Sequence, residues 1–329
     1  METQPSPAIS APLPPITPYE QKQLLPFGIL VKTSFRVWRE HASAFVQIGL
    51  VPLIASVLFS MPQLVGVRSP AFFGLFQLVV VVVSIFYSIC LFTAVSEGMA
   101  LPQGIWGVYK RAGKLFFPFV WLFILVIAMT FGGGLLLAVP GILVGVRTSL
   151  SLFAFVVEGR RGLSAHAYSW HLVRGHTWNV LWRFLVLALV VYVPLVLFFV
   201  LVGFVGSTFT DHTLAPAGDP AGLRIVLQNP ALGGGSSLPA PLSITSSILI
   251  STPTYFIVIP ILYIFSFLLY QSLKEMKGSP TPEEERKIRK TLKIFAWLGV
   301  VAILFVAVIA TLGILLITLL TPSGRTGPY

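Results

Sequence analysis

The chain has 329 residues, of which 56% are hydrophobic and only 10% are charged, and its mean hydropathy is +0.89. Soluble domains carry a charge on about a quarter of their residues, so this composition excludes an ordinary soluble protein. The formal net charge of +11 is compatible with a nucleic-acid partner. The basic residues, however, lie beside apolar stretches and not in a soluble patch with interleaved aromatic residues. We therefore predict an all-α integral membrane bundle that binds no nucleic acid.

The beginning of the chain is rich in proline and has no apolar period. Residues 1–27 contain seven prolines and lack the basic segment followed by an apolar segment that defines a signal peptide. Such a composition favours an extended chain over a packed core. We predict that residues 1–27 form a disordered, Pro-rich cytoplasmic tail.

Seven stretches approach or exceed the roughly 18 to 20 apolar residues that cross a hydrocarbon core. They cover residues 44–61, 71–96, 115–139, 141–157, 181–206, 246–272 and 292–321. We predict that the first six form a membrane bundle over residues 28–276, which includes an external loop at 208–243. A charged cytoplasmic linker at 277–291 then precedes the seventh transmembrane helix at 292–321 and a short tail at 322–329.

Basic residues are unevenly divided between the two sides of these spans. With the N-terminus inside, eighteen of the 22 Lys and Arg residues lie in cytoplasmic segments, and only Arg68, Arg224 and Arg325 lie outside. The positive-inside rule therefore predicts a cytoplasmic N-terminus and an external C-terminus. If the seventh segment is peripheral, the C-terminus lies inside instead.

Short basic segments with a helical spacing of apolar residues precede three spans, near residues 31–45, 105–116 and 163–174. We interpret them as interfacial amphipathic helices whose basic side meets anionic lipid headgroups. Ordinary solvated helices that lead into the spans are the alternative. Glu-Gly pairs end the second and fourth spans, at 97–98 and 158–159. This recurrence suggests a threefold repeat, in which each unit is an interfacial helix followed by two spans.

An arginine interrupts the fourth span, within PGILVGVRTSLSLF at 140–153. A charge at the bilayer centre costs about 2.5 to 3.5 kcal/mol in insertion experiments and often marks function. Small residues recur every four positions on one face and predict close helix packing; they are Gly141, Gly145 and Ser149. Arg147 lies on the other face together with Ser151. Arg147 either extends to the outer surface or lines a polar path.

An acid at the end of the fourth span presents a second anomaly. Glu158 lies at a helix C-terminus, where a negative charge opposes the helix dipole. We expect it to pair with Arg160, Arg161 or Arg174, and so to clamp the span to the helix that follows. Contact with a headgroup or a substrate is the alternative.

No catalytic or metal-binding pattern is found. His166, His171 and His176 are five residues apart, so they cannot converge on one metal from a single helix, and we interpret them as unrelated surface histidines. Cys90 is the only cysteine, which excludes an intramolecular disulfide. The glycines at 132–134 are assigned to a flexible turn. We predict no cofactor and no enzymatic activity.

One stretch carries a family resemblance. Its residues are Pro140-Gly141-Ile142, Val146-Arg147, Ser149-Leu150, Val156-Val157-Glu158-Gly159, Gly162-Leu163, Ala165, Ser169-Trp170, Leu172-Val173-Arg174-Gly175 and Trp178. This pattern resembles the signature of the bacterial family called the glycerophosphoryl diester phosphodiesterase membrane domain, and YciC-like six-span proteins are similar.

The resemblance implies a helical bundle in the bacterial cytoplasmic membrane without implying activity. In fused members of the family the chemistry belongs to a separate soluble barrel, which needs about 250 residues. Only TPSGRTGPY follows the last span here, so no such domain fits. The 208–243 loop and the seventh span depart from the family pattern.

Three functions remain open at this point. The leading one is a non-catalytic integral membrane protein that associates with anionic lipid headgroups at the cytoplasmic face, or with a protein partner that the sequence does not identify. The alternative is a transporter of a small anionic solute or lipid that uses Arg147. An intramembrane enzyme is the third and has the least support. The candidate binding or structural residues are Arg147, Ser151, Glu158 and Arg174.

Overall fold

The computed structural model describes residues 24–64, 70–98, 104–136, 138–214 and 251–320, and every regular element in these ranges is a helix. Six helical segments are long and apolar enough to cross a membrane: Gly74–Ser96, Gly104–Gly134, Val139–Glu158, Thr177–Phe198, Ser251–Lys277 and Pro282–Gly313. A seventh is formed if the bent pair at the beginning of the described chain is counted as one span. The prediction of a multi-pass, all-helical membrane protein is confirmed.

The first predicted unit forms three helices, α1 (Phe27–Glu40), α2 (Ala42–Leu64) and α3 (Pro70–Ser96). The axes of α1 and α2 differ by 81° across a break at His41. A separate basic helix therefore precedes α2. Trp38 holds α1 in place, because its Nε1 donates to the carbonyl of Phe256 at 2.7 Å. The N-terminal half of α2 packs on the same later segment of the chain, because Gly49 leaves room for the Phe256 ring.

The second predicted interfacial helix is not a separate element. Residues 105–116 belong to α4 (Gly104–Leu136), a continuous helix that contains Pro118. Proline is tolerated inside long membrane helices because neighbouring groups satisfy the freed carbonyl. The proposed repeat stays a hypothesis, and its second unit lacks the break that separates α1 from α2.

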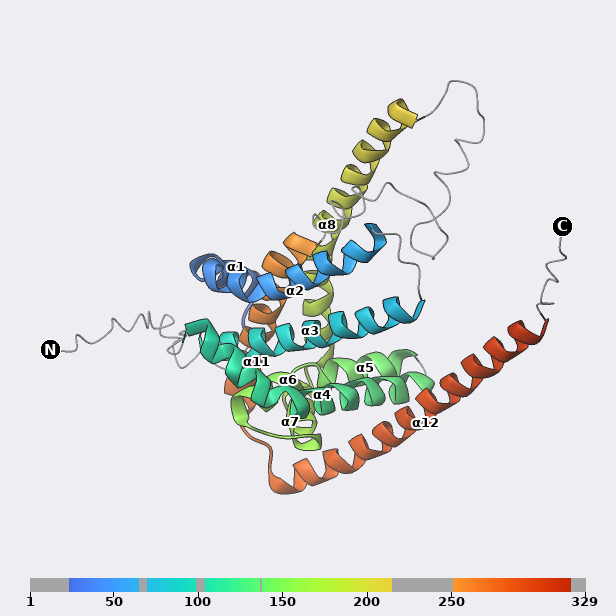
Figure 1. Ribbon diagram of the computed structural model, residues 1–329. Helices are drawn as coiled ribbons and strands as arrows, with labels where there is room; N and C mark the ends of the chain where they lie inside the picture. The colour runs from blue at the N-terminus through green and yellow to red at the C-terminus, as the bar shows by residue number, and fades with distance from the viewer. Residues whose placement is uncertain (1–23, 65–69, 99–103, 137, 215–250, 321–329) are drawn as a thin grey trace.

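The fourth span is broken near its arginine. It consists of α5 (Ala138–Thr148) and α6 (Ser151–Glu158), joined by a turn at residues 149–150. Helix α6 ends at Glu158, and the following Gly159 has a φ of +65°, the left-handed conformation in which glycine commonly ends a helix. The short helix α7 (Leu163–Val173) and the long helix α8 (Thr177–Leu214) follow. Figure 1 shows α8 leaving the bundle toward the top of the view.

The last part of the described chain consists of the π-helical turn η2 (Thr254–Val258), α11 (Ile259–Lys277) and α12 (Pro282–Leu320). Most of the predicted charged linker at 277–291 is helical, and no break separates it from the seventh span, because α12 is one helix from the charged segment into that span. Glu283, Glu284 and Glu285 occupy its first turn, where negative charge is favoured by the helix dipole.

Three predicted segments lie largely outside the described residues. They are the tail at 1–27, the external loop at 208–243 and the tail at 322–329. Two parts of them are described. Residues 24–26 lead into α1, and residues 208–214 belong to α8 rather than to the loop.

Glycines allow α12 to lie against α4 at backbone distance (Figure 1). A Cβ atom placed on Gly299 would lie 1.6 Å from the carbonyl oxygen of Ala128, and one on Gly132 would lie 2.1 Å from the carbonyl oxygen of Phe295. The assignment of residues 132–134 to a flexible turn is therefore wrong, since they lie inside α4. The first half of α12 therefore packs on the bundle, whereas most side chains after Gly299 are exposed.

The predicted packing stripe on the fourth span is confirmed in part. A Cβ on Gly141 would lie 2.8 Å from the Cα of Gly134 on α4, so this glycine permits the tight α4–α5 hairpin. Gly145 makes only ordinary contact with Thr130. Ser149 lies in the turn between α5 and α6, where its hydroxyl donates to the carbonyl of Val146 at 2.8 Å.

We predict that Gly299→Ala destabilises the protein by about 1 to 3 kcal/mol, the usual range for overpacking a tight contact. Gly313→Ala is the matched control on the same helix, because a Cβ there meets nothing within 4 Å. Thermal unfolding in detergent measures both. Equal melting temperatures for the two variants would contradict the close α4–α12 contact.

Candidate functional site around the buried helix α7

Helix α7 is enclosed by the rest of the bundle. It packs against α5, α6, α11 and α12, and eight of its residues are buried: Ala165, His166, Ala167, Tyr168, Ser169, Trp170, Leu172 and Val173. The predicted helix at 163–174 is present, but the prediction that it lies at the membrane interface is wrong, because most of its side chains are buried. The small side chains of the first half permit close approach on several sides, which an amphipathic surface helix does not need.

Arg147 points toward α7 and the first residue of α8. Its Nε donates to Thr177 Oγ1 at 3.2 Å, and its guanidinium carbon lies 4.7 Å from the centre of the Trp170 ring. A cation over a tryptophan face gains about 0.5 to 2 kcal/mol. The Arg147 carbonyl also accepts a hydrogen bond from Ser169 Oγ at 2.7 Å. The Arg147 side chain is half-buried, and its contacts with Trp170 and Thr177 hold it where α5, α7 and α8 meet.

Ser151 and Arg147 lie on opposite sides of the turn at residues 149–150. Ser151 begins α6, beyond the turn that ends α5, and its buried hydroxyl has no hydrogen-bond partner among the described residues. The spacing argument assumed one continuous helix over 141–157. The turn at 149–150 interrupts that helix, although Val139–Glu158 still forms one segment of membrane-spanning length.

Glu158 pairs with a lysine far along the chain. Its Oε1 lies 2.5 Å from Lys274 Nζ and accepts a hydrogen bond of 3.3 Å from the Tyr270 hydroxyl. The predicted pairing of Glu158 with an arginine near it in sequence is wrong. The clamp joins α6 to α11, since both partners of Glu158 belong to α11.

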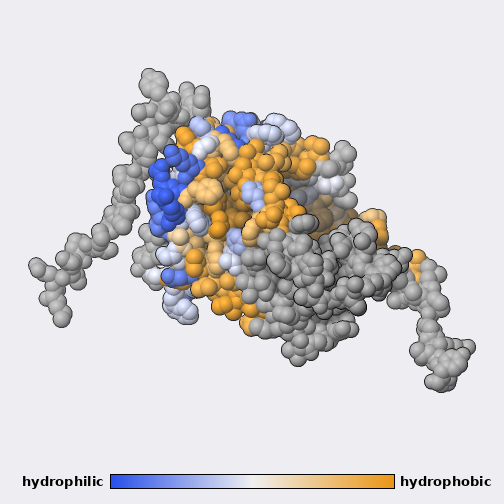
Figure 2. All heavy atoms as spheres, turned by 90° about the horizontal axis from the view of Figure 1, so that it is seen from above, coloured by the Kyte–Doolittle hydropathy of each residue, from blue (hydrophilic) through white to orange (hydrophobic). Residues whose placement is uncertain are grey.

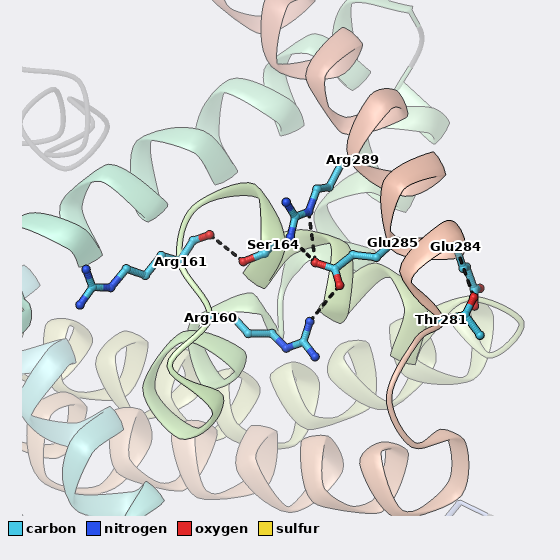
Figure 3. A network of polar contacts seen from close by, with 7 residues as sticks. All are labelled: Arg160, Arg161, Ser164, Thr281, Glu284, Glu285 and Arg289. Carbon is cyan, nitrogen blue, oxygen red and sulfur yellow. Dashed lines mark hydrogen bonds and ion pairs between the residues drawn. The ribbon is translucent and has the colours of Figure 1, made fainter.

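Arg160 instead connects the α6–α7 loop with α12. Its Nη1 lies 3.3 Å from Glu285 Oε2, and its guanidinium covers the Tyr168 ring at 4.3 Å. Figure 3 shows Glu285 between Arg160 and Arg289, with Arg289 one turn further along α12. The Glu285 side chain is only 17% exposed, so one face of this part of α12 packs on the bundle, while Glu283, Arg286 and Lys287 stay exposed.

Arg174 lies just beyond the end of α7 and faces the first turn of α12. Its Nη1 is 3.8 Å from Glu284 Oε1, which also lies 3.1 Å from His171 Nδ1. Lys277 Nζ donates to the carbonyls of His171, at 3.0 Å, and Arg174. Lys277 thus satisfies two carbonyls at the C-terminal end of α7, which a helix leaves without internal partners.

His166 is fully buried in α7, and neither ring nitrogen makes a well-formed hydrogen bond with the described residues. Burial lowers the pKa of its imidazole to about 4, and the backbone of Leu122 opposes this shift. The ring is therefore neutral at physiological pH. The interpretation of His166 as a surface residue is wrong, and His171 is also mostly buried, with 13% of its side chain exposed.

These contacts form a polar site whose parts come from distant segments. The sequence identified Arg147, Glu158 and Arg174 but not the partners Thr177, Lys274 or Glu284, which have no motif of their own. Among the described residues, no group of three or more His, Cys, Asp or Glu could hold a metal ion. No family model, curated protein or solved structure matches this chain.

We predict that Glu158→Gln and Lys274→Gln lower the melting temperature non-additively, with a coupling of about 0.2 to 1 kcal/mol for a partly exposed pair. Glu158→Gln and Arg174→Gln are expected to be additive, because these residues contact different partners. Melting in detergent of the three single variants and the two double variants measures both cycles. Coupling between Glu158 and Arg174, with none between Glu158 and Lys274, would contradict the observed pairing.

Proposed function

We propose that this chain is a non-catalytic integral membrane protein of the bacterial cytoplasmic membrane that associates with anionic lipid through its basic, cytoplasmic end. The N-terminus is cytoplasmic and the C-terminus external in this proposal, as the positive-inside rule indicates. The resemblance to the glycerophosphoryl diester phosphodiesterase membrane domain supports the location. The observation that carries the proposal is the pairing of exposed tryptophan and lysine side chains at the ends of several helices.

One such pair lies in a surface hollow between α2, α3 and α4. Its lining is Val51, Phe86, Trp106, Tyr109 and Lys110. The rings of Phe86 and Tyr109 stack at 5.9 Å, and the Tyr109 hydroxyl donates to the carbonyl of Gln47 on α2 at 3.3 Å. Apolar walls with a lysine and a tryptophan suit an acyl chain whose headgroup is anionic.

A second hollow on α12 repeats this combination. Lys293 and Trp297 lie one turn apart and line it together with aliphatic residues. The tryptophans at the beginning of α8 are likewise exposed, Trp178 by 72% and Trp182 by 62%. Tryptophan is enriched where hydrocarbon meets headgroups. Three places therefore have the composition of one interfacial belt: Trp106 with Lys110 on α4, Trp178 and Trp182 on α8, and Lys293 with Trp297 on α12.

The surface of the molecule supports the same arrangement. Figure 2 shows a broad hydrophobic area on the face seen from above, with hydrophilic residues gathered along one margin. On a soluble protein, an exposed apolar area of this extent marks a surface that contacts a lipid or another protein. On a membrane span it is expected, because the apolar side chains face the lipid. In this proposal the hydrophilic margin makes the contact with the headgroups.

The alternative is transport of a small anion or lipid along a path that includes Arg147. In its favour, no carboxylate pairs with this guanidinium among the described residues. Packing against Trp170 and Thr177 offers a structural reason for the arginine, and Arg147 lines neither of the two hollows described above. Anion flux in reconstituted vesicles that Arg147→Leu abolishes would favour transport.

We expect the double variant Lys110→Gln, Lys114→Gln to retain less phosphatidylglycerol than the wild type. Each lysine near an anionic surface contributes about 1 kcal/mol. Arg286→Gln, Lys287→Gln is the matched control, because these exposed residues lie on α12 about 15 Å or more before Trp297. Native mass spectrometry of the full chain, released from nanodiscs with equal phosphatidylglycerol and phosphatidylcholine, counts the retained lipids.

Preferential retention of phosphatidylglycerol by the wild type and the control, with a clear loss in the α4 variant, is the expected result. A wild-type protein that retains both lipids equally would contradict the proposed function. Equal losses in both double variants would contradict the role of the α4 hollow.

A further inference from the structure

We propose that the turn between α7 and α8 is a binding site for a phosphate group, formed by Arg147, Arg174 and Lys277. The inference rests on the proposed association with anionic lipid and assigns it a specific site. The same chemistry would bind free phosphate, and the experiment below separates the two sources.

The three cations come from different elements and reach one short segment, residues 171–177. Arg147 arrives from α5 and donates to Thr177 at 3.2 Å. Lys277 arrives from the end of α11 and donates to the carbonyls of His171 and Arg174, and its Nζ would lie 3.9 Å from a Cβ on Gly175. Arg174 is part of the segment itself. Folding therefore concentrates positive charge at the turn.

Negative charge does not balance these cations within the described residues. The only carboxylate in contact is Glu284, which lies 3.8 Å from Arg174 and is shared with His171. Neither Arg147 nor Lys277 forms an ion pair there. Like charges held this close repel one another unless a counter-ion is present. An anion bound at the turn removes that repulsion.

A fourth cation lies beside the turn. Arg183, on the second turn of α8, has a buried Nη1 that makes no hydrogen bond with the described residues. The pKa of His176 is lowered, first by burial and then by Lys277 and Arg183. The positive charges of both side chains therefore act on the imidazole in the middle of the turn. The unpaired guanidinium nitrogen is a further donor for an anionic ligand.

The exposure of the turn indicates which anion fits. The Arg174 side chain is 63% exposed, so the site opens to the surface. Trp178, the second residue of α8, is exposed as well, which suits the headgroup depth of a membrane. Guanidinium groups bind phosphate with paired hydrogen bonds, and α8 begins in the same turn, at Thr177, where a helix N-terminus favours an anion. A lipid headgroup phosphate satisfies each of these requirements.

The test uses the purified full chain in detergent, with short-chain phosphatidic acid, short-chain phosphatidylcholine and inorganic phosphate as probes. Microscale thermophoresis and thermal-shift assays measure the affinities of these probes. We expect phosphatidic acid to bind the wild type, phosphatidylcholine to bind far more weakly, and Arg174→Gln to weaken phosphatidic acid about tenfold, as removal of a charged donor does. Arg286→Gln removes the same charge from an exposed position on α12 and should leave the affinity unchanged.

Arg147→Lys is the second variant, for the case in which Arg174→Gln unfolds. It keeps the charge but loses the guanidinium fork, so it also weakens binding. Competition by millimolar inorganic phosphate would assign the site to free phosphate, and its absence would assign it to lipid; both outcomes support a phosphate site. Wild-type affinity in Arg174→Gln and Arg147→Lys, or an equal loss in Arg286→Gln, would overturn it.

Failure of this site is distinguishable from failure of the proposed function. If the wild type retains no phosphatidylglycerol from nanodiscs, the lipid-association proposal itself is wrong. If the wild type and Arg174→Gln retain it equally, lipid association stands and only the assignment to the α7–α8 turn is overturned.

Discussion

The burial of a short polar helix is the constraint on which this structure depends. Helix α7 carries histidine, serine, tyrosine and tryptophan side chains into the interior, and burying polar groups is costly unless they find partners. The surrounding helices provide most of those partners. Lys277 satisfies carbonyls at its C-terminal end, the Arg147 carbonyl accepts from Ser169, and Trp170 receives the Arg147 guanidinium.

The ion pairs of the bundle flank this helix. Glu158, just before α7, contacts Lys274, while Arg160 and Arg174 on its two sides contact Glu285 and Glu284. Two of these three pairs lead to the first turn of α12, whose charged start is therefore a structural element. Gly299 then lets the apolar part of α12 lie against α4. The seventh span is fixed to the bundle at two places by two different kinds of contact.

Much of this fold could be predicted from the sequence, because long apolar stretches leave few alternatives. Helix type, the approximate number of spans and the break after α1 all follow from local hydropathy and spacing. The burial of α7 does not, because a stripe such as Leu163, Ala167 and Trp170 looks the same on a surface helix and on one face of an enclosed helix. The α12 segment that covers it lies more than a hundred residues further on.

The candidate site could be predicted only in part, for the same reason. An arginine in an apolar run and an acid at a helix end are visible as local anomalies. Their partners are not, since Lys274 is one of many basic residues and is far from Glu158 in sequence. From the sequence, the arginines that follow Glu158 were the expected partners, whereas the fold brings Lys274 of α11 beside Glu158 of α6. The continuity of α4 and α12 was also hidden, because charge composition suggested boundaries where the backbone has none.

The account is tested most directly by hydrogen–deuterium exchange of the full chain in detergent, followed by mass spectrometry of peptides that cover residues 163–173. Enclosure of α7 predicts amide protection comparable to that of the buried helix at 259–277. Exchange within seconds, as expected for a helix resting on the membrane surface, would contradict the buried helix and the polar site built around it.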